Sequence, residues 1–184
     1  MHCRLKTRSV MKIITIVAIS LLLLCQVASA TAPIPLGSID VKLDVTAPER
    51  IEIENPTGGG WYSNIKLENT PENRSLFQAE VPVRVKLRQA ESFTISVKTP
   101  LILTRETSAA HSVALAFLPA EVKWGRAGHL QPLAAIPQKF TVDKGTTSQN
   151  SADYLLHISA LAPDGQDTAG KYQGQLTLIF EINS

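Results

Sequence analysis

A regular alternation of apolar and charged residues is the feature of this sequence that most restricts its fold. From Ile39 to Val45 every second residue is apolar, and the residues between them are charged. Because successive side chains of a β-strand point to opposite faces, this pattern predicts a strand with one buried and one exposed face. The pattern recurs at Ile51/Ile53, Ile65/Leu67, Val81/Val83/Val85/Leu87, Phe93/Ile95/Val97, Val113/Leu115/Phe117, Val122/Trp124, Phe140/Val142 and Leu176/Leu178/Phe180/Ile182. The sequence therefore predicts an all-β protein with about nine short strands.

Residues that favour turns separate these segments. Clusters of Gly, Pro, Asn and Asp lie at 55–60, 70–73, 144–145 and 163–165, at a spacing typical of a β-sandwich. No stretch of ten residues has helical periodicity, and no linker or repeat divides the chain. Pro82 has no N–H to donate, so we expect its strand to lie at a sheet edge or a bulge. Trp124 alternates with Val122 and is expected in the core.

The N-terminus has the three parts of a secretory signal peptide. Four basic residues lie ahead of an apolar run from 13 to 24, which is followed by an Ala-x-Ala motif ending at Ala30. The apolar run is shorter than the ~20 residues that span a bilayer. We therefore predict a signal peptide at 1–30, cleavage after Ala30, and no membrane span in the mature chain. Met11 is an alternative start, and the sequence leaves the choice between Met1 and Met11 open.

The composition of the predicted mature chain excludes several classes of protein. The signal holds four of the 18 Lys and Arg residues and none of the 16 Asp and Glu residues, so the mature chain carries a formal charge of −2. Without basic clusters it has no electrostatic surface for nucleic acid. Both cysteines, Cys3 and Cys25, lie in the signal, so packing rather than a disulfide must stabilise the domain. Leu24 stands where a small residue normally precedes a lipidated cysteine, so we expect no lipid anchor.

The sequence contains no recognisable catalytic or metal site. The three histidines of the mature chain, His111, His129 and His157, have no ligand-type spacing and are expected at the surface or in strands. There is no mature cysteine to act as a thiol nucleophile, and no G-x-S-x-G turn to present a serine. We therefore predict a protein that is not an enzyme and needs no cofactor.

Two aromatic residues follow a glycine loop. No Lys-Ser/Thr follows Gly58-Gly59-Gly60, so the loop is not a phosphate cradle. Trp61 and Tyr62 beside it are candidate contacts for a sugar or a partner. They support an alternative function, that of a self-contained secreted carbohydrate-binding β-sandwich. Tyr172, at the entry to the last predicted strand, has the position of the tyrosine corner in immunoglobulin-like sandwiches.

Three segments stand out in order along the chain: SIDVKLDVTAPERIEI near the N-terminus, VALAFLPAEVKWG in the middle and AGKYQGQLTLIFEINS at the end. Together they resemble the subunits of bacterial fimbriae built by the alternate chaperone-usher pathway, the alpha-type or colonisation-factor-antigen-type pilins. The similarity covers most of the mature chain. The resemblance implies an immunoglobulin-like β-sandwich that lacks one strand and is completed by a donor strand from a neighbouring subunit.

The resemblance also implies roles for particular residues. Residues 31–47 would be the N-terminal extension with the donor strand, and 48–184 the pilin domain. Four residues would face the groove of the neighbour: Ile39, Val41, Leu43 and Val45. The alternation alone also fits a first strand that packs within its own sandwich, and we favour the donor-strand interpretation.

The implied partners are neighbouring fimbrial subunits in a homo- or hetero-polymer, a periplasmic chaperone and an outer-membrane usher. The protein would pass through the periplasm to a fimbria on the cell surface, where it supports adhesion. Residues 31–37 lengthen the stretch before the donor strand beyond what the major pilins of the family have. Either the protein is a minor or initiating subunit, or the signal is cleaved later than Ala30.

Overall fold

The computed structural model describes residues 39–48, 50–58, 60–106, 116–144, 149–163 and 169–182. The predicted signal peptide and Ala30 lie outside these residues. The described residues form strands and no helix, so the all-β prediction is confirmed. Among these residues there is accordingly no helix that could cross a membrane. The strands are β1 (Ile39–Thr46), β2 (Ile51–Glu54), β3 (Asn64–Asn69), β4 (Leu76–Arg88), β5 (Ser92–Thr99), β6 (Thr104–Arg105), β7 (Glu121–Arg126), β8 (His129–Pro132), β9 (Gln138–Thr141), β10 (Gln149–Leu161) and β11 (Tyr172–Ile182).

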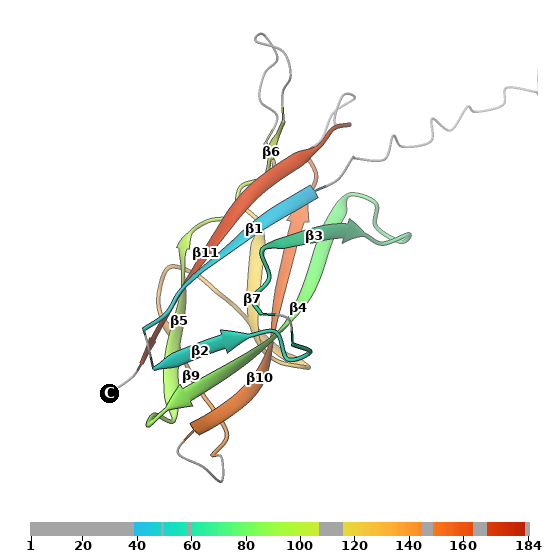
Figure 1. The fold of residues 1–184 in the computed structure, drawn as a ribbon. Coiled ribbons are helices and arrows are strands. Elements are labelled where there is room, and N and C mark those ends of the chain that lie inside the picture. Colours follow the sequence, from blue (N-terminus) through green and yellow to red (C-terminus); the bar gives the residue numbers. More distant parts are fainter. Residues whose placement is uncertain are drawn as a thin grey trace, which may run out of the picture. The chain divides into compact units, whose positions relative to one another are not determined.

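Nine of the strands follow one hydrogen-bonded path, in the order β8-β7-β10-β4-β3-β1-β11-β5-β9, while β2 pairs with β4 and β6 pairs with β11 off this path. β3 joins the two halves of this path, because residues 64–67 pair with β1 while Glu68 and Asn69 pair with β4. The path curls so that its two halves face each other (Figure 1). For example, the ring of Trp124 in β7 lies edge-on to Phe180 in β11, with centroids 5.6 Å apart. The result is a β-sandwich with its core between the two layers.

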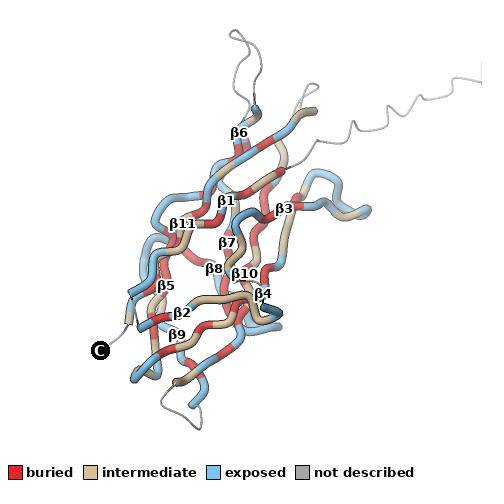
Figure 2. The backbone as a smooth tube through the Cα atoms, in the orientation of Figure 1, coloured by how far each residue is buried: buried red, intermediate tan, exposed pale blue. Residues whose placement is uncertain are grey.

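The core is aliphatic along most strands and aromatic at its centre. Buried and exposed residues alternate along the strands, as the sequence pattern predicts (Figure 2). Trp124 is fully buried, which confirms its predicted place, and it stacks on Tyr154 of β10 at 5.1 Å between centroids. Phe93 of β5 contacts both Tyr154 and Phe180. These rings tie together strands that lie far apart in the sequence.

The longest strand that was not predicted from the sequence is β10. It pairs with β4 over its whole length and with β7 over part of it, so it lies in the middle of its layer. Its buried apolar residues do alternate: Ala152, Tyr154, Leu156, Ile158 and Ala160. Two of these are small alanines, and Leu155 places an apolar residue on the outer face, so the period is weak in the sequence. The predicted strand at 113–117 lies mostly outside the described residues.

Pro82 lies at a local gap in strand pairing rather than at the end of a sheet. On one side it pairs with Leu155 of β10. On the other side β4 pairs with β3 at Phe77 and Gln78 and with β2 from Arg84, so Pro82 has no strand partner there. A proline tolerates that position because its missing N–H would have nothing to bond.

Gly174 of β11 lies where the segment before β6 crosses the strand, opposite Val41 of β1. A Cβ atom at Gly174 would lie 2.7 Å from the carbonyl oxygen of Ile102. It would also lie 2.8 and 2.9 Å from the side chains of Leu101 and Leu103, which are both fully buried. Glycine is thus required here by the close approach of a neighbouring backbone.

We expect Gly174→Ala to destabilise the fold. The added methyl meets a main-chain oxygen, which cannot move without shifting the segment, and overpacking of this kind costs about 1–3 kcal/mol. Urea unfolding of the mature domain should show a lower midpoint. Gln173→Ala, at an exposed neighbouring position, should leave the midpoint nearly unchanged. Equal unfolding midpoints for both variants would show that residues 101–103 can shift to accommodate the added methyl group at little cost.

Candidate functional site

The N-terminal strand β1 lies between two strands from distant parts of the chain (Figure 1). It runs parallel to the last strand, β11, with Ile39 opposite Tyr172 and Thr46 opposite Ile179. On its other side it runs antiparallel to β3. We call the place that β1 fills, between β3 and β11, the β1 position. In the described structure the chain fills this position with its own strand.

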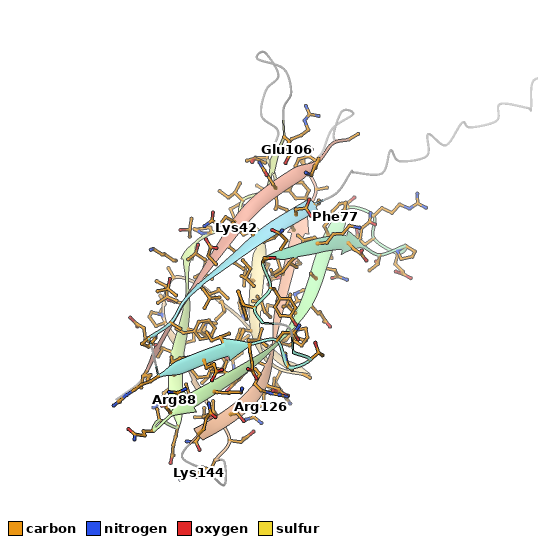
Figure 3. The ribbon with its side chains drawn as sticks, in the orientation of Figure 1. Lys42, Phe77, Arg88, Glu106, Arg126 and Lys144 are labelled. Atoms are coloured by element: carbon orange, nitrogen blue, oxygen red, sulfur yellow. The ribbon has the colours of Figure 1, made fainter. Side chains whose placement is uncertain are left out.

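Alternate side chains of β1 enter the core. Ile39 and Val41 are fully buried and Leu43 is 3% exposed, while Val45 is partly buried against the same cluster. The intervening residues face outward, and Lys42 among them is exposed (Figure 3). Full burial of an aliphatic side chain contributes about 1.5–3 kcal/mol. The four residues predicted from the alternation are therefore the ones that anchor β1.

The two halves of β1 are held differently. Residues 39–42 pair with both neighbours, whereas residues 43–46 pair with β11 alone. Side chains from outside β1 also bond to this second half. The indole N–H of Trp61 donates to the main-chain oxygen of Leu43 at 3.4 Å, and the amide of Gln175 in β11 bonds to the carboxylate of Asp44.

Trp61 and Tyr62, the predicted contacts for a sugar or a partner, are half-buried and directed at the sandwich. Their rings meet edge to face, 5.7 Å apart, and both pack against the core. The Tyr62 hydroxyl donates to the main-chain oxygen of Pro82 at 2.9 Å, and burial raises its pKa above the ordinary value. The polar atoms of both residues thus bond within the domain. Binding of a sugar by these residues stays a prediction that the fold does not favour.

The predicted tyrosine-corner residue, Tyr172, is the first residue of β11 and is fully buried. Its ring lies edge-on to Phe117 with centroids 5.0 Å apart. It also stands opposite Ile39, the first residue of β1. Tyr172 therefore packs at one end of the β1 position, while its role as a tyrosine corner stays a prediction.

A second candidate site is a pocket of about 330 Å³ between β7, β8, β9 and β10. Charged and aromatic groups both line it. Its lining includes Arg126, His129, Lys139, Phe140 and Tyr154. Arg126 is ion-paired with Asp143 at 2.7 Å. Burial raises the pKa of Tyr154 to about 12, and its hydroxyl donates to the Thr141 oxygen. The phenol of Tyr154 and the guanidinium of Arg126 are thus both bonded within the domain.

The histidines agree with the sequence analysis where they are described. His129 is exposed at the start of β8, and His157 is half-buried within β10, while His111 lies outside the described residues. Within the described ranges no three His, Cys, Asp or Glu residues come close enough to hold a metal ion. The β1 position is thus the feature with the clearest functional geometry.

Comparison with known proteins gives a consistent result. The sequence matches the model of the CS1 type fimbrial major subunit family over residues 37–181, a range that includes nearly all of the strands described above. The structure is similar to that of the CooA pilin subunit from enterotoxigenic Escherichia coli, with a TM-score of 0.57 and 17% identity over 73% of this chain and 88% of that chain. No match was found among curated proteins. The structural likeness shows a shared fold, and the family match shows that the chain belongs to the CS1 type fimbrial major subunits and is a structural subunit of a fimbria.

Proposed function

We propose that this fimbrial subunit polymerises by strand exchange, in which β1 of one subunit fills the β1 position of a neighbour. The observation that carries the proposal is the place of β1 in the fold. It is the first strand of the described chain, it is buried along one face, and only residues 47–50 connect it to β2. The first strand of the described chain can be replaced by the same strand of another copy without changing the order of the other strands.

The energy of the contact supports a long-lived polymer. Ile39, Val41 and Leu43 together bury apolar surface worth roughly 4.5–9 kcal/mol, at about 1.5–3 kcal/mol for each side chain. Main-chain hydrogen bonds to both flanking strands add to this, as in other cases of strand addition. Part of the gain is offset by ordering the strand and by association. Because a neighbour's β1 must lose this burial before it can leave, the contact should dissociate slowly once it has formed.

The pathway around this step is proposed on the resemblance of the sequence. Residues 1–30 would direct export and be removed after Ala30, residues 31–47 would form the donor extension, and 48–184 the pilin domain. A periplasmic chaperone would hold the subunit, and an outer-membrane usher would assemble the fimbria at the cell surface. Adhesion would be the purpose of the organelle, so the subunit itself needs no catalytic group or cofactor.

Isotope mixing tests the exchange directly. Polymers would be assembled from equal amounts of ¹⁴N and ¹⁵N subunits and treated with an amine-reactive cross-linker. Lys42 of β1 pairs with Asn64, and Asp40 pairs with Lys66 of β3, so the two lysines are diagonal neighbours on the same face of the sheet. If β1 comes from a neighbour, mass spectrometry should find mixed ¹⁴N/¹⁵N cross-links between Lys42 and Lys66.

The ion-paired lysine of β4 provides the internal control. Lys86 contacts Glu54 of β2, and both strands belong to one subunit in either case. A reagent that couples carboxylates to amines should join Lys86 to Glu54 in the same polymers, and this cross-link should be isotopically pure. Pure cross-links between Lys42 and Lys66 in the polymer would reject strand exchange.

A further inference from the structure

We propose that the free subunit is closed by its own β1, and that Trp61 is the latch that holds this strand in place. The inference rests on the proposed exchange of β1, and it adds an earlier step, the release of β1 from its own subunit. A subunit with its own strand in the β1 position has no space for the strand of a neighbour. Polymerisation then begins with release of β1, at a rate that the latch controls.

The closed state is favoured by the short connection. Residues 47–50 join β1 to β2, so β1 cannot move far from its own β1 position. A tethered strand has an effective concentration in the millimolar range, whereas a strand on another subunit has only the concentration of the protein. The same side chains are buried in either case. At micromolar concentration the strand of the same chain therefore wins.

The latch acts on the half of β1 that lacks one strand partner. β3 pairs only with residues 39–42, so the side of Leu43 that faces away from β11 has no strand beside it in the described structure. Trp61 precedes β3 in the chain and supplies the missing donor, its indole N–H, to the Leu43 oxygen. The ring also packs against the core. Trp61 thus continues the β3 side of the sheet with a side chain in place of a strand.

Hydrogen bonds within the turn before Trp61 fix the position of this residue. The N–H of Gly58 donates to the Asn55 oxygen at 3.0 Å, and the N–H of Asn55 donates to the Gly60 oxygen at 3.3 Å. Gly58 and Gly60 have φ values of 90° and 84°, which residues with a Cβ rarely adopt. The Asn55 side chain closes the turn by accepting from the N–H of Thr57. This turn returns the chain toward β1 directly ahead of Trp61.

Tyr62 provides a matched control. It is adjacent to Trp61, equally half-buried, and also makes one side-chain hydrogen bond to a main-chain oxygen. Its acceptor belongs to Pro82 in β4 and not to β1. Removing the Tyr62 hydroxyl therefore removes a comparable bond without touching the latch.

The test is amide hydrogen exchange of the purified mature subunit, Thr31 to Ser184, in three forms: unmodified, Trp61→Phe and Tyr62→Phe. In the unmodified subunit we expect β1 amides to be protected. Trp61→Phe should raise exchange within β1 about fivefold, the ratio that corresponds to one hydrogen bond of about 1 kcal/mol. Tyr62→Phe should leave β1 unchanged, and β10 should be unchanged in both variants. An unprotected β1 in the unmodified subunit overturns the closed state, and equal β1 exchange in all three forms overturns the latch.

A second measurement separates this inference from the proposed exchange. A labelled peptide of residues 38–47 would be added to the same three proteins at millimolar concentration, so that it can compete with the tethered strand, and its incorporation would be followed with time. Faster uptake by Trp61→Phe alone supports both ideas, whereas equal uptake by all three proteins rejects the latch. If β1 responds to Trp61→Phe in hydrogen exchange but no protein takes up the peptide, the latch stands and the strand exchange is wrong.

Discussion

Replacing Val41 and Leu43 together by aspartate is expected to abolish fimbriae. Both side chains are buried, at 0% and 3% exposure, on the one face of β1 that enters the core. Each substitution removes about 1.5–3 kcal/mol of apolar burial and forces a carboxylate toward an apolar interior, which costs more unless it is paired. The combined loss approaches or exceeds the whole contribution of β1. Electron microscopy and the yield of sheared fimbriae would measure the effect.

The control for this experiment lies on the same strand. Lys42 is exposed between the two positions, so Lys42→Asp introduces the same charge without burying it and should leave fimbriae in place. The proposed pathway further predicts that the double variant still accumulates with its chaperone, because the chaperone would complete the sandwich without β1. Normal fimbriae in the double variant would contradict any role of β1 in assembly.

A disulfide between β1 and β3 is expected to block polymerisation reversibly. Lys42 and Asn64 are paired across the two strands and both are exposed. Paired residues of antiparallel strands have Cα atoms about 4.5–5.5 Å apart, within the range that a disulfide spans. The predicted mature chain has no other cysteine, so Lys42→Cys with Asn64→Cys can form one bond only. Oxidised subunits should stay monomeric in light scattering, and reduction should restore polymers.

A second disulfide serves as the control. It shows whether any loss of polymerisation comes from fixing β1 in place or from cross-linking the domain at any position. Thr94 of β5 and Glu181 of β11 are also paired, but neither belongs to β1. The variant with Thr94→Cys and Glu181→Cys should therefore polymerise in both redox states. Polymers formed by the oxidised Lys42→Cys, Asn64→Cys subunit would mean that β1 need not leave its own sandwich.

The alternation predicted β1 as a strand, but it did not predict whether β1 packs in its own subunit or in a neighbouring one. At Ile39, Val41 and Leu43 the burial follows the period of two closely, because each residue's face is fixed by its own strand. Whether β1 pairs within its chain or with a neighbour depends on concentration and on competing strands, which no local pattern encodes. The resemblance to fimbrial subunits supplied the family, and the family match confirmed it.

The errors and omissions have equally local causes. β10 was missed because its alternation uses Ala152 and Ala160, which carry little hydrophobic signal. Pro82 was expected at a sheet edge or a bulge, whereas it lies in a strand with neighbours on both sides, at a gap between β3 and β2. The bond from Trp61 to Leu43 joins residues eighteen positions apart and depends on a glycine turn. The sequence marked Trp61 as noteworthy but gave no sign of its acceptor.

The parallel pairing of β1 with β11 joins the first and the last strand of the described chain. During synthesis β1 is made first, yet its partner is not made until nearly the whole domain has followed. Such a contact between distant segments forms slowly compared with the hairpins between them. Until β11 is in place, β1 is an exposed strand with an apolar face, a form prone to aggregation. The order of the strands thus gives every new copy an interval in which its β1 position is open. During that interval either its own β1 or the β1 of another copy can fill the position.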